Sequence, residues 1–147
     1  MKIVGFNRVE LIVREDQIHQ AVAQFNELLG LRLPEPIAIQ GHPVLSSTDF
    51  EGSVEFVAPL KGEGPFAHRL AEHGAGQIGP LVWEIEDLGA ARAWLAQRGY
   101  RIFFEYDSSK GSADEAQNPV QQLVLDPEQW FGFHVTLMQR ARPKVGP

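Results

Sequence analysis

Alternating apolar and polar positions predict the first half of the fold. Residues 6–13 (FNRVELIV) alternate with period two, which is typical of a strand with one face on a core. Apolar residues recur at helical spacing over 18–29 and stop at Gly30, so this stretch predicts a helix. The pattern then predicts two strands, separated by a polar turn at 46–52, and a short helix: 43–45, 53–59 and 65–73.

The same order recurs in the second half of the chain. A strand is expected at 80–85, followed by a helix that starts after Glu86 and Asp87 and ends at Gly99. Three further strands are expected at 100–106, 120–125 and 131–138. Because an acidic pair precedes the main helix of each half, we expect an α+β fold made of two βαβββ repeats. The expected organisation is a single domain, 1–147, with repeats over about 1–78 and 79–139 and a tail at 140–147.

The strand faces that point away from the helices carry most of the candidate chemistry. Alternate positions of a strand lie on opposite faces, and one set packs under the helices. The opposite set holds charged and polar residues: Arg8, Glu10, Glu55, Glu84, His134 and Thr136. Apolar residues are mixed with them, namely Ile12, Val57, Val82 and Met138. This mixture favours a concave pocket, and a solvated sheet face is the alternative. The polar segment 107–119 is either an exposed hairpin tip or a mobile lid over that pocket.

Composition limits the classes of function. The chain has 147 residues, a formal net charge of −6 and no cysteine. An acidic chain lacks the basic face of a nucleic-acid or anionic-membrane binder. The absence of cysteine excludes disulfides, thiol catalysis and iron–sulfur sites. No secretory or transmembrane apolar run is present. We therefore expect a cytoplasmic protein that acts on a small molecule.

The doubled strand–helix–three-strand unit resembles the vicinal oxygen chelate superfamily, which includes glyoxalases, bleomycin-resistance proteins and extradiol dioxygenases. Three stretches resemble its methylmalonyl-CoA epimerase-like branch: Gln40-Gly41 leading into VEFVAPL, then GPFAHRLAEHGAGQIGPLVWEIEDL, and LVLDP. The resemblance covers about residues 6–139. It implies a curved, mostly antiparallel sheet with helices on the outer face, and a homodimer. An uncovered strand edge in each half gives the same expectation of a partner.

The resemblance also locates a possible metal centre. Metal-binding members take one ligand from the first and one from the late strand of each half, and the matching positions are Arg8, Glu55, Pro80 and Thr136. Of these, Glu55 alone suits a cation, and the acid that the epimerase branch carries before Gln-Gly is replaced by Ile39. We therefore expect neither simple glyoxalase nor methylmalonyl-CoA epimerase activity, and no cofactor. A rearranged divalent-metal site that uses Glu55 and His134 stays open.

Three hypotheses for function follow. In the first, a lyase or isomerase moves protons through Glu55 and His134 while Arg8 anchors an anionic or carbonyl-bearing ligand. In the second, a bleomycin-resistance-like protein binds a cationic ligand without chemistry. In the third, a metal-dependent lyase or dioxygenase uses the rearranged site. Further ligand contacts are expected from Glu10, Glu84, Thr136, His42 and Trp130. The structural alternative is that Arg8 only neutralises Glu10 or Glu55.

Overall fold

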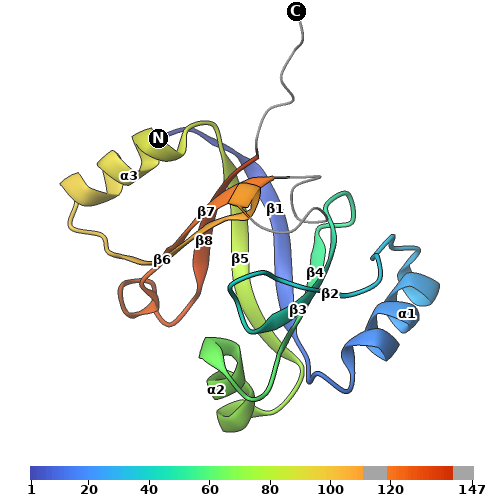
Figure 1. Cartoon of the computed structure of the whole chain (residues 1–147). Coiled ribbons are helices and arrows are strands. Elements are labelled where there is room, and N and C mark those ends of the chain that lie inside the picture. The colour runs from blue at the N-terminus through green and yellow to red at the C-terminus, as the bar shows by residue number, and fades with distance from the viewer. Residues whose placement is uncertain (111–118, 141–147) are drawn as a thin grey trace, which may run out of the picture. The chain divides into compact units, whose positions relative to one another are not determined.

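The computed structural model describes residues 1–110 and 119–140 (Figure 1). The strands are β1 (Ile3–Ile12), β2 (Ile37–Ala38), β3 (Val44–Asp49), β4 (Val54–Pro59), β5 (Gln77–Ile85), β6 (Ile102–Asp107), β7 (Val120–Leu125) and β8 (Val135–Arg140). The α-helices are α1 (Ile18–Leu29), α2 (Gly64–His73) and α3 (Leu88–Gln97). The order strand, helix, three strands occurs twice, in β1-α1-β2-β3-β4 and in β5-α3-β6-β7-β8, which confirms the expected α+β fold.

The chain divides into two compact units. The first unit is Asn7–Leu81, and the second is Met1–Phe6 together with Val82–Pro147. The hydrogen-bonded strand order is β2-β3-β4-β1-β5 in the first unit and β1-β5-β8-β7-β6 in the second. The long strands β1 and β5 therefore contribute residues to both units. The expected repeat boundaries and single domain stay predictions.

The first unit is built around a parallel pair of strands. β1 pairs with β4 in parallel, with Glu10 opposite Glu55, and β3 pairs with β4 in antiparallel fashion. One face of these strands packs against α1 in a core that contains Ile18, Val22 and Phe56. Leu11 on β1 also packs against this core. Since side chains alternate along a strand, the residues next to Leu11 on β1 and next to Phe56 on β4 face away from α1.

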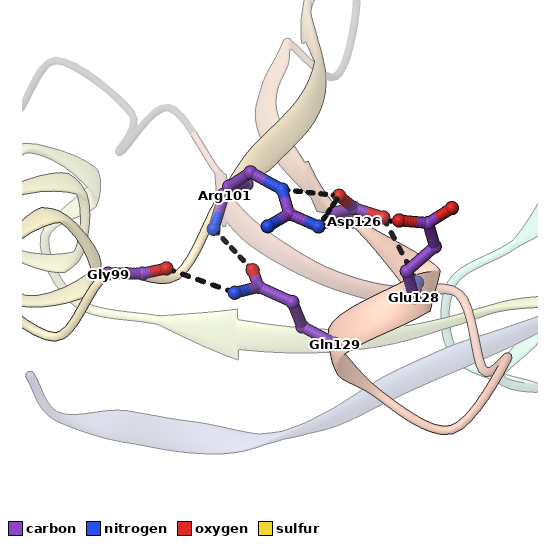
Figure 2. A network of polar contacts seen from close by, with 5 residues as sticks. All are labelled: Gly99, Arg101, Asp126, Glu128 and Gln129. Carbon is purple, nitrogen blue, oxygen red and sulfur yellow. Dashed lines mark hydrogen bonds and ion pairs between the residues drawn. The ribbon is translucent and has the colours of Figure 1, made fainter.

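The second unit has its own core between α3 and the antiparallel strands β7 and β8. Leu95, Leu123 and Leu137 belong to this core. A polar network joins the segment before β6 to the turn after β7 (Figure 2). Arg101 donates through Nε to Asp126 at 2.7 Å, and its backbone N–H donates to Gln129 at 2.6 Å.

Several sequence-based strand boundaries are wrong. β1 begins at Ile3 and not at 6, and β5 begins at Gln77 and not at 80. The last strand begins at Val135 and not at 131, because Phe131 has φ of 59° and lies in a turn, which pairing in a strand does not permit. The expected turn at 46–52 instead continues β3 to Asp49. β2 has no counterpart in the sequence-based assignment.

The expectations for the polar segment 107–119 and for the C-terminal tail fall partly on residues that the structure does not describe. These residues are 111–118 in the polar segment and 141–147 in the tail. Within residues 1–110 and 119–140, no helix has the length and apolar character needed to cross a membrane.

Candidate functional site

Three charged side chains meet on the face of the first unit that points away from α1. Arg8 donates through Nε to Oε2 of Glu55 at 2.6 Å and through a terminal nitrogen to Oε1 of Glu10 at 3.2 Å. The other terminal nitrogen donates to Oδ1 of Asn7 at 2.9 Å. The sequence-based grouping of Arg8, Glu10 and Glu55 on one face is thus realised as a set of direct contacts, which we call the Arg8 cluster.

The strand register explains why these residues meet. Arg8 and Glu10 are two residues apart on β1, so their side chains share a face. The parallel register places Glu10 directly opposite Glu55 on β4. Val54 and Phe56, the neighbours of Glu55, pack in the α1 core and thereby orient Glu55 to the other face.

Burial makes the charges of the Arg8 cluster interdependent. Arg8, Glu10 and Glu55 are only 3%, 6% and 7% exposed. One guanidinium and two carboxylates would leave a net negative charge in a desolvated site, which is costly. One of the two carboxyls is therefore expected to keep its proton.

The contacts identify Glu10 as the carboxyl that keeps the proton. Burial, followed by the nearby charge of Glu55, raises the pKa of Glu10 well above its usual value. Burial alone would raise the pKa of Glu55 too, but the charge of Arg8 and the hydrogen bond from Ser46 lower it overall. Although desolvation opposes its charge, Arg8 has a raised pKa because Glu55 and Glu10 stabilise the guanidinium. The cluster therefore contains an ionised Glu55 hydrogen-bonded to a neutral Glu10.

Three contributors to this site were not found from the sequence. Ser46 donates its hydroxyl to Oε1 of Glu55 at 2.6 Å, and Asn7 accepts from Arg8. The ring of Phe50 lies 5.4 Å from the guanidinium carbon of Arg8, within range of a cation–π contact. Ser46 and Phe50 fall inside the segment that the sequence predicts as a turn. The alternation that would have revealed Ser46 is hidden, because the run SSTD is polar on both faces.

The other predicted site residue of the first unit is His42. It is half-buried in the turn between β2 and β3, where its backbone N–H donates to the carbonyl of Ile39. Its expected ligand contact stays a prediction.

The remaining predicted site residues belong to the second unit. Glu84 pairs with Arg140 at 3.4 Å. Thr136 is fully buried, and its hydroxyl has no hydrogen-bond partner among the described residues. Trp130 packs against the α3 core with its ring 4.9 Å from that of Tyr100. His134 is half-buried and directly precedes β8. The catalytic and ligand roles expected for these four residues stay predictions.

The positions that would hold a metal do not form a coordination set in the first unit. Arg8 places a permanent positive charge against Glu55, and Pro80 has no side-chain donor. Both carboxylate oxygens of Glu55 already accept hydrogen bonds, from Arg8 and Ser46. No group of three or more His, Asp or Glu side chains within 1–110 and 119–140 could hold a metal ion.

Comparison with known proteins gives relatives over almost the whole chain. A curated protein of Cereibacter sphaeroides, ethylmalonyl-CoA/methylmalonyl-CoA epimerase, is 30% identical over 135 residues, covering 90% of this chain and 96% of the relative. A methylmalonyl-CoA epimerase structure from Mycobacterium tuberculosis has a TM-score of 0.76 at 21% identity, covering 97% of this chain and 91% of that one.

A second solved structure has the same fold. A Streptomyces coelicolor methylmalonyl-CoA epimerase variant in complex with 2-nitronate-propionyl-CoA has a TM-score of 0.76 at 14% identity, covering 96% of this chain and all (100%) of that one. The family model described as Glyoxalase/Bleomycin resistance protein/Dioxygenase superfamily matches residues 7–120. This chain is a member of the Glyoxalase/Bleomycin resistance protein/Dioxygenase superfamily.

Proposed function

We propose that this protein is an isomerase-type enzyme that moves a proton at a carbon next to a carbonyl. The observation that carries the proposal is the Arg8 cluster, in which a neutral and an ionised carboxyl share a buried site with a guanidinium. A neutral carboxyl can donate a proton and a carboxylate can accept one, which are the two states that an isomerisation needs. Arg8 stabilises the negative charge that develops when the proton leaves carbon.

Acyl thioesters are the proposed substrate class. The Cereibacter sphaeroides relative is named for its action on ethylmalonyl-CoA and methylmalonyl-CoA, and a solved epimerase holds methylmalonyl-CoA. The proton α to a thioester carbonyl is acidic enough for removal by a carboxylate near a cation. Ile39 occupies the position where the epimerase-like branch carries an acid, so we propose that the proton passes through the Arg8 cluster instead.

Glu55 and His134 are each proposed as catalytic residues, as the sequence suggested, with Glu10 as a further proton carrier beside Glu55. Glu84, Thr136, His42 and Trp130 are proposed ligand contacts. A homodimer is proposed as well, on the resemblance and on the uncovered strand edge expected in each half, and light scattering of the purified protein measures it. Dependence of the activity on a divalent metal is a separate outcome, which activity before and after chelation decides.

Exchange of the α-proton in D₂O tests the proposal. Methylmalonyl-CoA, ethylmalonyl-CoA and longer acyl-CoAs are incubated with the protein, and loss of the α-proton signal is followed by NMR. Replacing Glu55 by Gln or His134 by Ala should slow exchange about 10²- to 10⁴-fold. Glu27→Gln, on the exposed face of α1, is the matched control and should have no effect. Absence of exchange with every thioester, or equal rates for all variants, would contradict the proposal.

A binding protein without turnover is the second candidate. The observation that favours it is charge, because the chain carries a formal net charge of −6. This candidate predicts a cationic ligand that is recovered unchanged after tight binding. Native mass spectrometry of the purified protein detects such a ligand directly.

A further inference from the structure

We propose that the guanidinium of Arg8 is a built-in cation that takes the place of a divalent metal in this member of the superfamily. Oxygen atoms of three residues converge on it: Glu55 Oε2 at 2.6 Å, Asn7 Oδ1 at 2.9 Å and Glu10 Oε1 at 3.2 Å. Oxygen atoms of two carboxyl groups and one amide are ligands of the kind that hard divalent cations prefer. In this chain they bind a side chain instead.

Both carboxylate oxygens of Glu55 already accept hydrogen bonds. Oε2 accepts from Arg8 and Oε1 accepts from the hydroxyl of Ser46 at 2.6 Å. A metal ion would have to displace both donors before it could take Glu55 as a ligand. Glu10 is engaged as well, because it contacts Arg8 and forms a hydrogen bond with Glu55.

The guanidinium is fixed where it lies. It is buried, its charge is permanent, and its planar set of donors contacts three acceptors in different directions. The ring of Phe50 lies 5.4 Å from the guanidinium carbon. Because like charges repel strongly where water is excluded, a divalent ion is kept out as long as Arg8 stays in place.

The role of such a cation follows from its contacts. It holds the side chains of Glu55, Glu10 and Asn7 together through direct hydrogen bonds, a task that needs positive charge but no open coordination site. This inference concerns the site of the proposed function, but it rests on contacts and not on the reaction. Metal binding is therefore measured without substrate, so that the inference and the proposed function can fail separately.

Titration with Mn²⁺, followed by electron paramagnetic resonance of the free ion, tests the inference. The wild-type protein should bind no Mn²⁺ with a dissociation constant below about 1 mM, which is the value for the weakest protein sites made of oxygen ligands. Arg8→Ala removes the guanidinium and frees the side-chain oxygens of Glu55, Asn7 and Glu10. The affinity for Mn²⁺ should therefore rise about tenfold or more. Adding Glu55→Gln to Arg8→Ala should abolish that gain. Arg14→Ala, which removes an exposed arginine paired with Asp16, is the matched control and should not bind the ion.

Rescue by a small cation provides a second readout. Guanidinium chloride at low millimolar concentration should raise the Tm of Arg8→Ala and leave that of Arg14→Ala unchanged, since the free ion can fill the vacated position. If Arg8→Ala does not fold, Arg8→Gln takes its place in both measurements. The inference is overturned if the wild-type protein binds one Mn²⁺ per chain and Glu55→Gln removes it. It is also overturned if a folded Arg8 variant gains no affinity for Mn²⁺ and no stability from guanidinium.

Discussion

At the scale of single residues, Arg8 sets the charge of everything around it. The two carboxyls it contacts differ in protonation because Glu55 makes the shorter contact with the guanidinium and also accepts from Ser46. Removing one partner from a buried set of charges leaves the others uncompensated. Arg8 therefore stabilises the fold of the first unit as well as its proposed chemistry.

We expect Arg8→Met to lower the free energy of unfolding by about 3–5 kcal/mol, because it leaves buried carboxyls without their cation. Arg14→Met should cost about 0–1 kcal/mol, because the Arg14–Asp16 pair is exposed. Urea denaturation at neutral pH measures both. Equal costs for the two variants would mean that the Arg8 cluster contributes no more than a surface ion pair.

The raised pKa of Glu10 and the lowered pKa of Glu55 predict pH dependences of folding stability that have opposite signs. With the pKa of Glu10 raised above the usual 4.5, the folded state holds a proton that the unfolded chain releases, so stability falls as pH rises above about 4.5. The pKa of Glu55 is lowered, so its contribution is lost as pH falls below 4.5. Glu10→Gln should remove the first effect alone, and over the range above pH 4.5 its stability relative to wild type should increase with pH. Parallel urea midpoints for the two proteins across this range would contradict the assigned protonation.

At the scale of elements, the two acidic pairs that precede the helices do different work. Asp87 is the N-cap of α3, and its carboxylate accepts from the backbone N–H of Ala90 at 3.0 Å. Asp16 instead pairs with Arg14, and α1 begins after Gln17 without a side-chain cap. The repeat in sequence thus marks the position of each helix but not the way it starts.

Replacing Asp87 by Ala should cost about 1 kcal/mol, because a backbone N–H at the start of α3 loses its acceptor. Asp16→Ala is the matched change at α1 and should cost about 0.5 kcal/mol or less, because it removes an exposed contact. Thermal unfolding followed by circular dichroism compares the two. A larger loss for Asp16→Ala would show that the capping assignment is wrong.

Regular elements could be predicted where one face is apolar. The helix over 18–29 and the strand over 120–125 have the expected bounds, since their apolar residues follow a single period. The start of β8 could not be predicted, because the left-handed backbone of Phe131 is set by the turn and not by hydropathy. The segment Ser46–Asp49 could not be predicted either, because its strand is stabilised by pairing with β4.

The candidate site was predictable only in part for a related reason. The alternation of side chains between the two faces of a strand is enough to place Arg8, Glu10 and Glu55 on one face, because it depends only on residue spacing along each strand. Their contacts, the contribution of Ser46 and the protonation of Glu10 depend on pairing between β1, β3 and β4, and a single sequence does not specify this pairing.

At the scale of the whole molecule, two cores are joined by shared strands. Residues 3–6 of β1 belong to the second unit and 7–12 to the first, and β5 is divided in the same way. Because β1 and β5 each continue from one unit into the other, unfolding of one unit would disrupt strands that also belong to the second. Loss of structure is therefore expected to be cooperative over both units.

All three tryptophans, Trp83, Trp94 and Trp130, lie in the second unit, so their fluorescence reports its unfolding. Ile18→Ala removes a fully buried side chain from the core of the first unit and should cost about 2–5 kcal/mol. It should shift the fluorescence midpoint in urea together with the circular dichroism midpoint. Leu95→Ala, the corresponding change in the second core, should do the same. A fluorescence midpoint that does not respond to Ile18→Ala would show that the units unfold independently.

The buried guanidinium of Arg8 has a consequence for how the protein matures. The guanidinium is part of the polypeptide, so the folded protein does not have to acquire its cation from solution. Neither a chelator nor a competing ion can remove it. The site is complete once the chain has folded, and it should serve equally well in a cell starved of metal and in one replete with it.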